Sequence, residues 1–183
     1  VRSVETAAAW VESWVATTTE GVRPGDASQW ALGLRMELGG GNDTSTSLGP
    51  AITLSRALGV AMEVDLTLRV QTGWIDLLGF GGVVQPYARG NFDAVLTLAV
   101  RQDVGAVTVL YGLGGGVRAL FGRFNNLVPA VEPSITARVP LTLRLAGEVR
   151  ASGQLLWPDG PPELDTPEWL NGRIAIGLRW TLP

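Results

Sequence analysis

The sequence predicts an all-β protein, an eight-stranded antiparallel up-and-down barrel over residues 28–183 with a short N-terminal segment, residues 1–27, in front of it. Three observations support this prediction. Eight segments alternate apolar and polar residues, short turns join neighbouring segments into hairpins, and long and short connections follow one another along the chain. Successive side chains of a β-strand point to opposite faces, so each segment predicts a strand with one apolar face. A chain of such hairpins is typical of a closed meander.

The alternation is clearest in Val60–Val70 (VAMEVDLTLRV), where aliphatic residues hold one parity and polar or small residues the other. The remaining strands are predicted at 29–39, 51–58, 91–102, 106–121, 131–139, 141–152 and 172–182. Long loops are expected at 74–90, 122–127 and 157–171, and minimal turns at Leu58-Gly59, Asp103–Gly105 and Pro140. This arrangement assigns all long loops to one end of the barrel, as expected of a barrel that spans an outer membrane.

The N-terminal segment does not share the period of two. Between Ser3 and Thr17, apolar residues recur at the spacing of an amphipathic helix, with Ser3 as its N-cap. They are Val4, Ala7, Ala8, Val11, Trp14 and Val15. We expect residues 1–27 to act as a cap or tether, as a plug in the barrel, or as a linker to another domain. The sequence opens at Val1 with no signal-peptide pattern, so we expect a mature or excised form.

The polar face of the strands mixes charges with very small residues, which predicts that this face points inward. Glycine weakens a strand and serves no purpose on a face exposed to water, but an eight-stranded lumen needs room for long side chains. The charges carry both signs, as buried charges must in order to pair. The predicted lumen network comprises Arg35, Glu37, Glu63, Asp65, Arg69, Asp93, Arg101, Arg118, Glu132, Arg138, Arg144, Glu148, Arg150, Arg173 and Arg179. We interpret it mainly as a structural set of salt bridges, with an ion or proton path as the alternative.

Aromatic residues gather near the predicted strand ends. Trp30 and Trp180 lie at one end; Trp74, Phe92, Phe121, Trp157 and Trp169 lie at the other. Two such girdles are expected where a barrel crosses the two membrane interfaces. The alternative that alternation alone leaves open is a soluble up-and-down barrel, as in lipocalins, that binds a small apolar ligand in its cavity.

Composition excludes several functions. The net charge is −3, so no basic surface for nucleic acid is expected. The chain has neither cysteine nor histidine, which removes thiol nucleophiles, the usual zinc ligands and the commonest general base. No apolar run reaches eighteen residues, so a transmembrane helix is excluded.

Two motifs resemble ligand sites without meeting their requirements. GGGNDTSTS (39–47) lacks the lysine and the following helix of a phosphate-binding loop. The acids of PDGPPELDTPE (158–168) lack the ligand spacing of a calcium loop. We interpret both as polar turns and predict no catalytic, cofactor-binding or metal residue.

The meander and the closing GRIAIGLRWTLP resemble small bacterial outer-membrane barrels of the OmpA/OmpX type, over residues 28–183. Those families end in a strand with outward aromatics and a terminal Phe; here Trp180 matches an outward aromatic, but the chain ends in Leu182-Pro183. Some eight-stranded outer-membrane barrels modify lipid A with a catalytic histidine, which this chain lacks.

The resemblance implies a porin-like transmembrane protein of the Gram-negative outer membrane. We predict a non-enzymatic anchor, scaffold or surface-interaction module. Outer-membrane lipid would surround it, and a protein partner would bind its long loops or N-terminal segment. A minor narrow pore is a further alternative.

Overall fold

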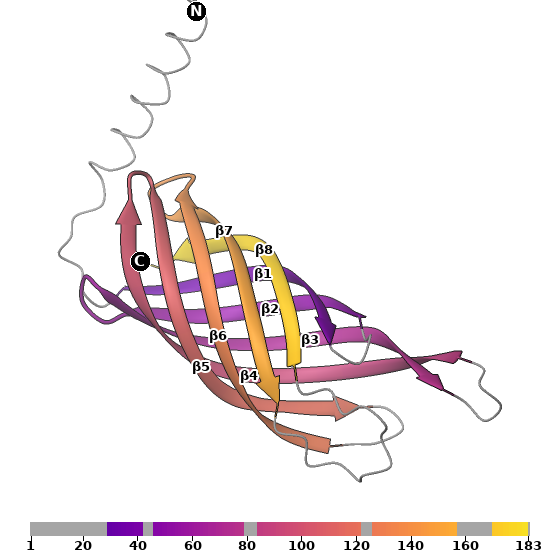
Figure 1. Cartoon of the computed structure of the whole chain (residues 1–183). Helices are drawn as coiled ribbons and strands as arrows, with labels where there is room; N and C mark the ends of the chain where they lie inside the picture. Colours follow the sequence, from indigo (N-terminus) through magenta and orange to yellow (C-terminus); the bar gives the residue numbers. More distant parts are fainter. Residues whose placement is uncertain (1–28, 42–45, 79–83, 122–125, 157–169, 183) are drawn as a thin grey trace, which may run out of the picture.

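The computed structural model describes residues 29–41, 46–78, 84–121, 126–156 and 170–182. These residues form eight antiparallel strands in chain order, and the last pairs with the first (Figure 1). The strands are β1 Trp30–Gly41, β2 Thr46–Ala57, β3 Met62–Leu78, β4 Val84–Val104, β5 Val107–Phe121, β6 Asn126–Pro140, β7 Leu145–Leu156 and β8 Leu170–Thr181. The predicted barrel is therefore confirmed. The expectation for residues 1–27 lies outside the described residues.

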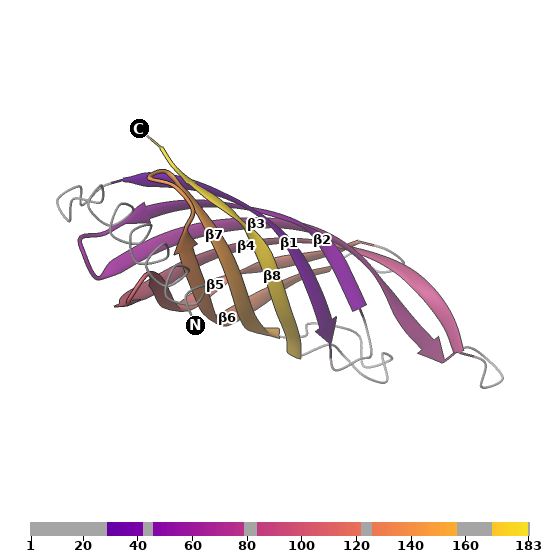
Figure 2. The same ribbon diagram turned by 90° about the horizontal axis from the view of Figure 1, so that it is seen from above.

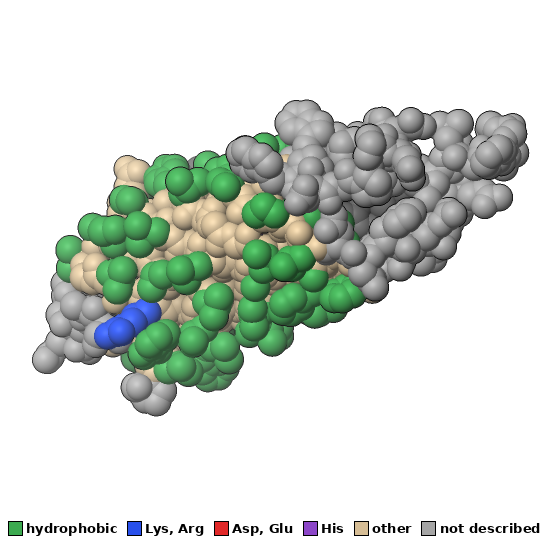
Figure 3. Space-filling model, turned by 90° about the horizontal axis from the view of Figure 1, so that it is seen from below, with side chains coloured by type: hydrophobic (Ala, Val, Ile, Leu, Met, Phe, Trp, Pro, Cys, Tyr) green, Lys and Arg blue, Asp and Glu red, His purple; other side chains and the backbone are tan. Residues whose placement is uncertain are grey.

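The barrel is inverted relative to a water-soluble protein. Along β1 exposure alternates strictly, with Leu34 and Leu38 exposed and Arg35 and Glu37 buried. The other strands repeat this pattern over most of their described length, and the face shown in the space-filling view carries many hydrophobic side chains (Figure 3). Apolar residues inside are few; Val128, Ala130 and Leu156 form one small cluster. In the described part of the chain, no helix is long and apolar enough to span a membrane.

The predicted loop at 74–90 is wrong over most of its length. β3 continues to Leu78 and β4 begins at Val84, and the two remain paired through Trp74↔Ala88 to Leu78↔Val84. β2 stops pairing with β3 at Trp74, and β5 stops pairing with β4 at Gly90, so this hairpin extends beyond its neighbours (Figures 1 and 2). A two-stranded extension has no core to face, so its residues need not alternate between apolar and polar. Pro86 is tolerated there because β4 has no β5 residue to hydrogen-bond on its other edge at this point.

Three other boundaries also differ from the prediction. β1 and β2 pair up to Gly40↔Thr46, so most of the 39–47 turn cluster is strand. β6 begins at Asn126 and not at the predicted Val131, because strand pairing continues through Pro129, a residue that is unusual inside a strand. The turn attributed to Pro140 is Leu141–Arg144, where the Thr142 hydroxyl accepts hydrogen bonds from the backbone N–H groups of Arg144 and Leu145. Between described strands, only the 157–169 connection is long, so the regular alternation of loop lengths is not observed.

Glycines allow neighbouring strands to approach where the barrel curves. A Cβ on Gly116 would overlap the Ala94 carbonyl oxygen and lie 2.8 Å from Val95 Cα. On Gly177 a Cβ would overlap the Leu34 carbonyl oxygen and lie 2.8 Å from Arg35 Cα. Both residues face inward, and both contacts are with backbone, which cannot turn aside as a side chain would. Glycine at such positions is a means of bending a sheet into a barrel.

We therefore expect Gly116→Ala to lower the free energy of unfolding by about 1–3 kcal/mol, the usual range for overpacking. Gly115→Ala is the matched control, because a Cβ there would point outward and meet nothing within 4 Å. Urea titration of both variants in detergent micelles measures the difference. Equal stability of the two variants would contradict the role given to Gly116.

Candidate functional site

The lumen is lined by a continuous network of arginines and carboxylates. Of the predicted network, thirteen residues lie inside the barrel. The arginines are Arg35, Arg69, Arg118, Arg138, Arg150, Arg173 and Arg179; the acids are Glu37, Glu63, Asp65, Asp93, Glu132 and Glu148. They reach the lumen because every second residue of a barrel strand faces inward.

Glu132 on β6 is the centre of the network. Its two carboxylate oxygens accept hydrogen bonds from Arg69 at 2.7 and 2.5 Å. Arg150 donates to Oε1 at 3.0 Å and Arg173 to Oε2 at 3.3 Å. The carboxylate of Glu132 is 0% exposed, and its three arginines come from β3, β7 and β8. One acid thus ties together strands from opposite parts of the sequence.

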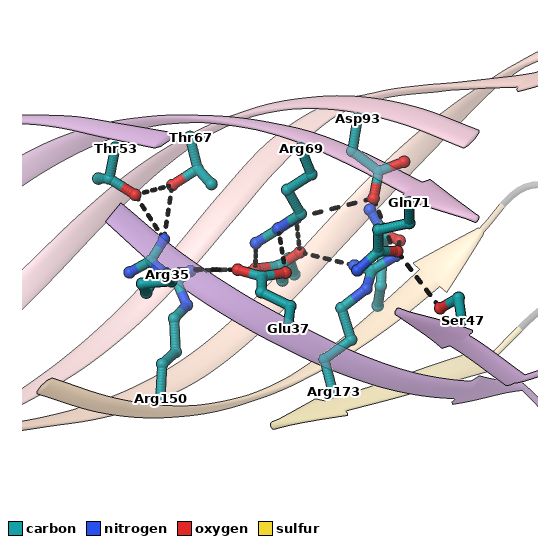
Figure 4. A network of polar contacts seen from close by, with 12 residues as sticks. Arg35, Glu37, Ser47, Thr53, Thr67, Arg69, Gln71, Asp93, Arg150 and Arg173 are labelled. Atoms are coloured by element: carbon teal, nitrogen blue, oxygen red, sulfur yellow. Dashed lines mark hydrogen bonds and ion pairs between the residues drawn. The ribbon is translucent and has the colours of Figure 1, made fainter. Parts of the chain in front are cut away.

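Arg35 and Arg69 continue the network through β1 (Figure 4). Arg69 Nε lies 2.7 Å from a carboxylate oxygen of Glu37, whose other oxygen is 3.6 Å from Arg35 Nε. Arg35 also donates to the hydroxyls of Thr53 at 2.5 Å and Thr67 at 3.2 Å. These two hydroxyls are 3.2 Å apart and bond to each other. The guanidinium of Arg35 is therefore held on several sides.

A second cluster lies toward the end of the barrel with the short turns, by which we mean the connections 58–61, 105–106 and 141–144. Glu63 accepts paired hydrogen bonds from Arg138 at 2.7 and 2.8 Å and from Arg179 at 2.7 and 3.0 Å. Arg138 also donates to Glu148 at 3.2 Å. Asp65 is less closely held, because the nearest guanidinium nitrogens of Arg138 and Arg150 are 4.0 Å away. Bidentate pairs of this kind are the strong form of the arginine–carboxylate contact.

A third cluster lies toward the opposite end. Asp93 accepts hydrogen bonds from Arg118 at 2.9 Å and from Arg173 at 2.8 Å. Both arginines also donate to the side-chain oxygen of Gln154. Beyond them, Gln71 accepts hydrogen bonds from Asn91 at 3.3 Å and Ser47 at 3.4 Å. The three clusters fill the lumen along the barrel.

The prediction missed the neutral polar members of this network. They are Ser47, Thr53, Ser55, Thr67, Gln71, Asn91, Thr97 and Gln154. The signal that would have found them is the same strand parity, because each lies on the inward-facing positions of its strand. The predicted lumen network contained only the charged residues at these positions.

Two predicted members are corrected. Arg144 is exposed in the turn after β6, because β7 begins at Leu145 and not at the predicted Leu141. Arg101 has the inward parity, but it lies three residues before the end of β4 and is exposed, paired with Asp103 at 3.0 Å. Neither residue reaches the network, since the inward face ends where the strands leave the barrel.

The central layer closes the bore. Arg69, Arg118, Glu132 and Gln154 are all at most 1% exposed to water. Side chains that line an open channel would be accessible to water, so no continuous water-filled path crosses this layer. The charged lining also rules out the apolar cavity expected of a lipocalin-like barrel. Among the described residues no group of His, Cys, Asp and Glu could hold a metal ion.

The aromatic positions are placed in part. Trp30, Phe92, Phe121 and Trp180 are exposed on the outer face. Arg56, the charged residue on that face in β2, lies over the ring of Trp30 at 5.3 Å. Trp74 belongs to β3, whereas Trp157 and Trp169 lie outside the described residues.

Comparison with solved structures agrees with this geometry. The chain is similar to a major outer membrane protein from Thermus thermophilus, with 12% identity, a TM-score of 0.64 and coverage of 85% of this chain and 100% of that one. It is also similar to the outer membrane protein OprG from Pseudomonas aeruginosa, with 11% identity, a TM-score of 0.61 and coverage of 85% of this chain and 96% of that one. For Neisserial surface protein A the identity is 7% and the TM-score 0.60, with coverage of 85% of this chain and 97% of that one.

The fold is that of a small outer-membrane β-barrel. At these identities the likeness concerns the fold alone. No family model matches the sequence, and no curated protein is significantly similar to it.

Proposed function

We propose that the protein is a non-enzymatic barrel of the bacterial outer membrane that acts as an anchor or scaffold, with its two ends as the interacting parts. The observation that carries the proposal is the closed central layer around Glu132. A barrel with an apolar outer face and a sealed, salt-bridged lumen fits a lipid bilayer and carries no solute across it. Functional contacts are then left to the strand ends and connections.

The network is proposed to be structural. Each of its arginines has a carboxylate partner within 4.0 Å, as buried charges require for the fold to be stable. A path for ions would need water or mobile charges at the layer where Glu132 and Arg69 are sealed. The same residues therefore favour a structural network over a pore.

The test uses the full chain in two measurements. Extracted in detergent and reconstituted in planar bilayers, the protein is expected to give no channel currents. A soluble reporter fused ahead of Val1 is expected to remain with the membrane fraction after salt washing. Stepwise conductance would overturn the closed-scaffold proposal in favour of a pore. Monodisperse protein in buffer without detergent would overturn the membrane location itself.

A further inference from the structure

The end of the barrel with the short turns carries exposed apolar side chains where turns are usually polar. Leu58 and Val60 in the β2–β3 turn are 47% and 72% exposed, and Leu143 in the β6–β7 turn is 64% exposed. Leu182 after β8 is also exposed. We call Leu58, Val60, Leu143 and Leu182 the apolar rim.

The apolar rim lies beyond the residues that mark the membrane interface. Leu58 and Val60 follow Arg56, whose guanidinium covers the Trp30 ring. Leu143 is two residues before Leu145, which pairs with Trp180, and Leu182 is two residues after Trp180. Charged and tryptophan side chains settle at the level of the headgroups. The apolar rim is therefore farther out than the hydrocarbon that would otherwise explain its composition.

The described part of the chain begins, at Gln29 and Trp30, between the two halves of the apolar rim. The Gln29 carbonyl accepts a hydrogen bond from Ala57 N–H, next to Leu58. The Trp30 carbonyl accepts one from Leu182 N–H, and the Arg144 carbonyl accepts one from Thr181 N–H. Gln29 thus lies with Leu58 on one side and Leu182 on the other.

The sequence of residues 3–17 complements this surface. Its helical spacing puts Val4, Ala8, Val11 and Val15 in one stripe. Its only charged residues are Glu5 and Glu12; seven positions apart, they fall together along one border of that stripe. The barrel presents exposed Arg56 beside Leu58 and exposed Arg144 beside Leu143. The apolar stripe is thus matched by the apolar rim, and the two glutamates are matched by the two arginines.

We propose that residues 3–17 dock across the apolar rim as an amphipathic helix and cap the end of the barrel with the short turns. Residues 18–28 connect the two and span up to about 35 Å when extended, ample for the segment to fold back. Because the segment is tethered at the rim, its effective concentration there is high and modest contacts suffice to hold it. Capping concerns a different surface from the sealed lumen and is independent of whether the barrel conducts.

The test uses the absence of cysteine from the sequence. In the full chain in lipid nanodiscs, the pair Val11→Cys and Val60→Cys is treated with a short bis-maleimide. It is expected to cross-link several-fold more than Val11→Cys with Leu127→Cys, at the other end of β6. Ser13→Cys with Val60→Cys, from the polar side of the predicted helix, is expected to be intermediate. Equal yields for all three pairs would overturn the proposal.

A second measurement separates the barrel from other occupants. A nitroxide on Val11→Cys is expected to be immobilised, and to become mobile when Leu58, Val60 and Leu143 are replaced by serine. Charge reversal by Arg56→Glu and Arg144→Glu should also release it, and Glu5→Arg with Glu12→Arg should restore it. Immobilisation that survives the serine variant, with spin–spin broadening by spin-labelled lipid, would assign the segment to the membrane surface. Cross-links only between chains would assign it to a second copy. Either result overturns the proposal.

Discussion

Glu132→Gln is expected to lower the free energy of unfolding by about 3–5 kcal/mol, the range measured when one partner of a buried ion pair is removed. The variant keeps the size of the side chain but replaces one carboxylate oxygen by an NH₂ group. That group is a donor and would face a guanidinium, also a donor. Arg69, Arg150 and Arg173 would then share an uncharged neighbour in a site without water.

Urea unfolding in micelles, followed by tryptophan fluorescence, measures this change. Asp103→Asn is the matched control, because its pair with Arg101 is half-exposed and such pairs contribute about 0–1 kcal/mol. Adding Arg150→Gln to Glu132→Gln removes one of the stranded charges, so the double variant should lose less than the sum of the single losses. A loss for Glu132→Gln no larger than the control, or strict additivity, would show that the network is not a coupled unit.

Leu66→Arg is expected to impair insertion and stability in lipid by about 2–4 kcal/mol, the cost of a cation on the lipid face near the bilayer midplane. Leu66 is 41% exposed on the outer face of β3 and pairs with Leu54 and Leu96, so apolar residues flank it on both sides. The substituted guanidinium would have no carboxylate or water within the belt. The measurement is refolding into liposomes, with folded protein quantified on a gel without heating.

Two controls test whether depth and face determine the effect of Leu66→Arg. Leu127→Arg lies near one end of β6, where such a change costs about 0–1 kcal/mol. Thr67→Ser, next to Leu66 but inward, keeps the hydroxyl that binds Arg35 and should be nearly silent. On a water-exposed surface, Leu66→Arg would be as mild as Leu127→Arg, and that outcome would contradict the transmembrane assignment.

The alternation of apolar and polar residues identified a strand only where its two faces meet different surroundings, the lumen on one side and the outer surface on the other. Glu63, Asp65 and Arg69 follow the inward parity of β3 and lie in the lumen. The alternation of Val60–Val70 separated the two faces of this strand, and the small residues and mixed charges of all the strands together indicated which face is inside. At 75–78 and 84–89 the two strands have no third strand beside them, and the alternation that would have revealed them is missing. Pro129 concealed the start of β6 for a different reason, because proline is unusual inside a strand. A strand can be recognised from its pattern only while its two faces meet different surroundings.

By itself, the sequence determined the eight-stranded meander and which face of each strand points inward, because parity is a local property and a bilayer demands the apolar face outside. Only the tertiary structure decided which charges meet. Arg69 and Glu132 are 63 positions apart, and Arg179 and Ser55 are 124 apart. Their contact depends on the register in which β1 closes on β8 and on how far each strand continues. Those are properties of the whole barrel, so Arg101 and Arg144, polar in the same pattern, lie outside the network that it forms.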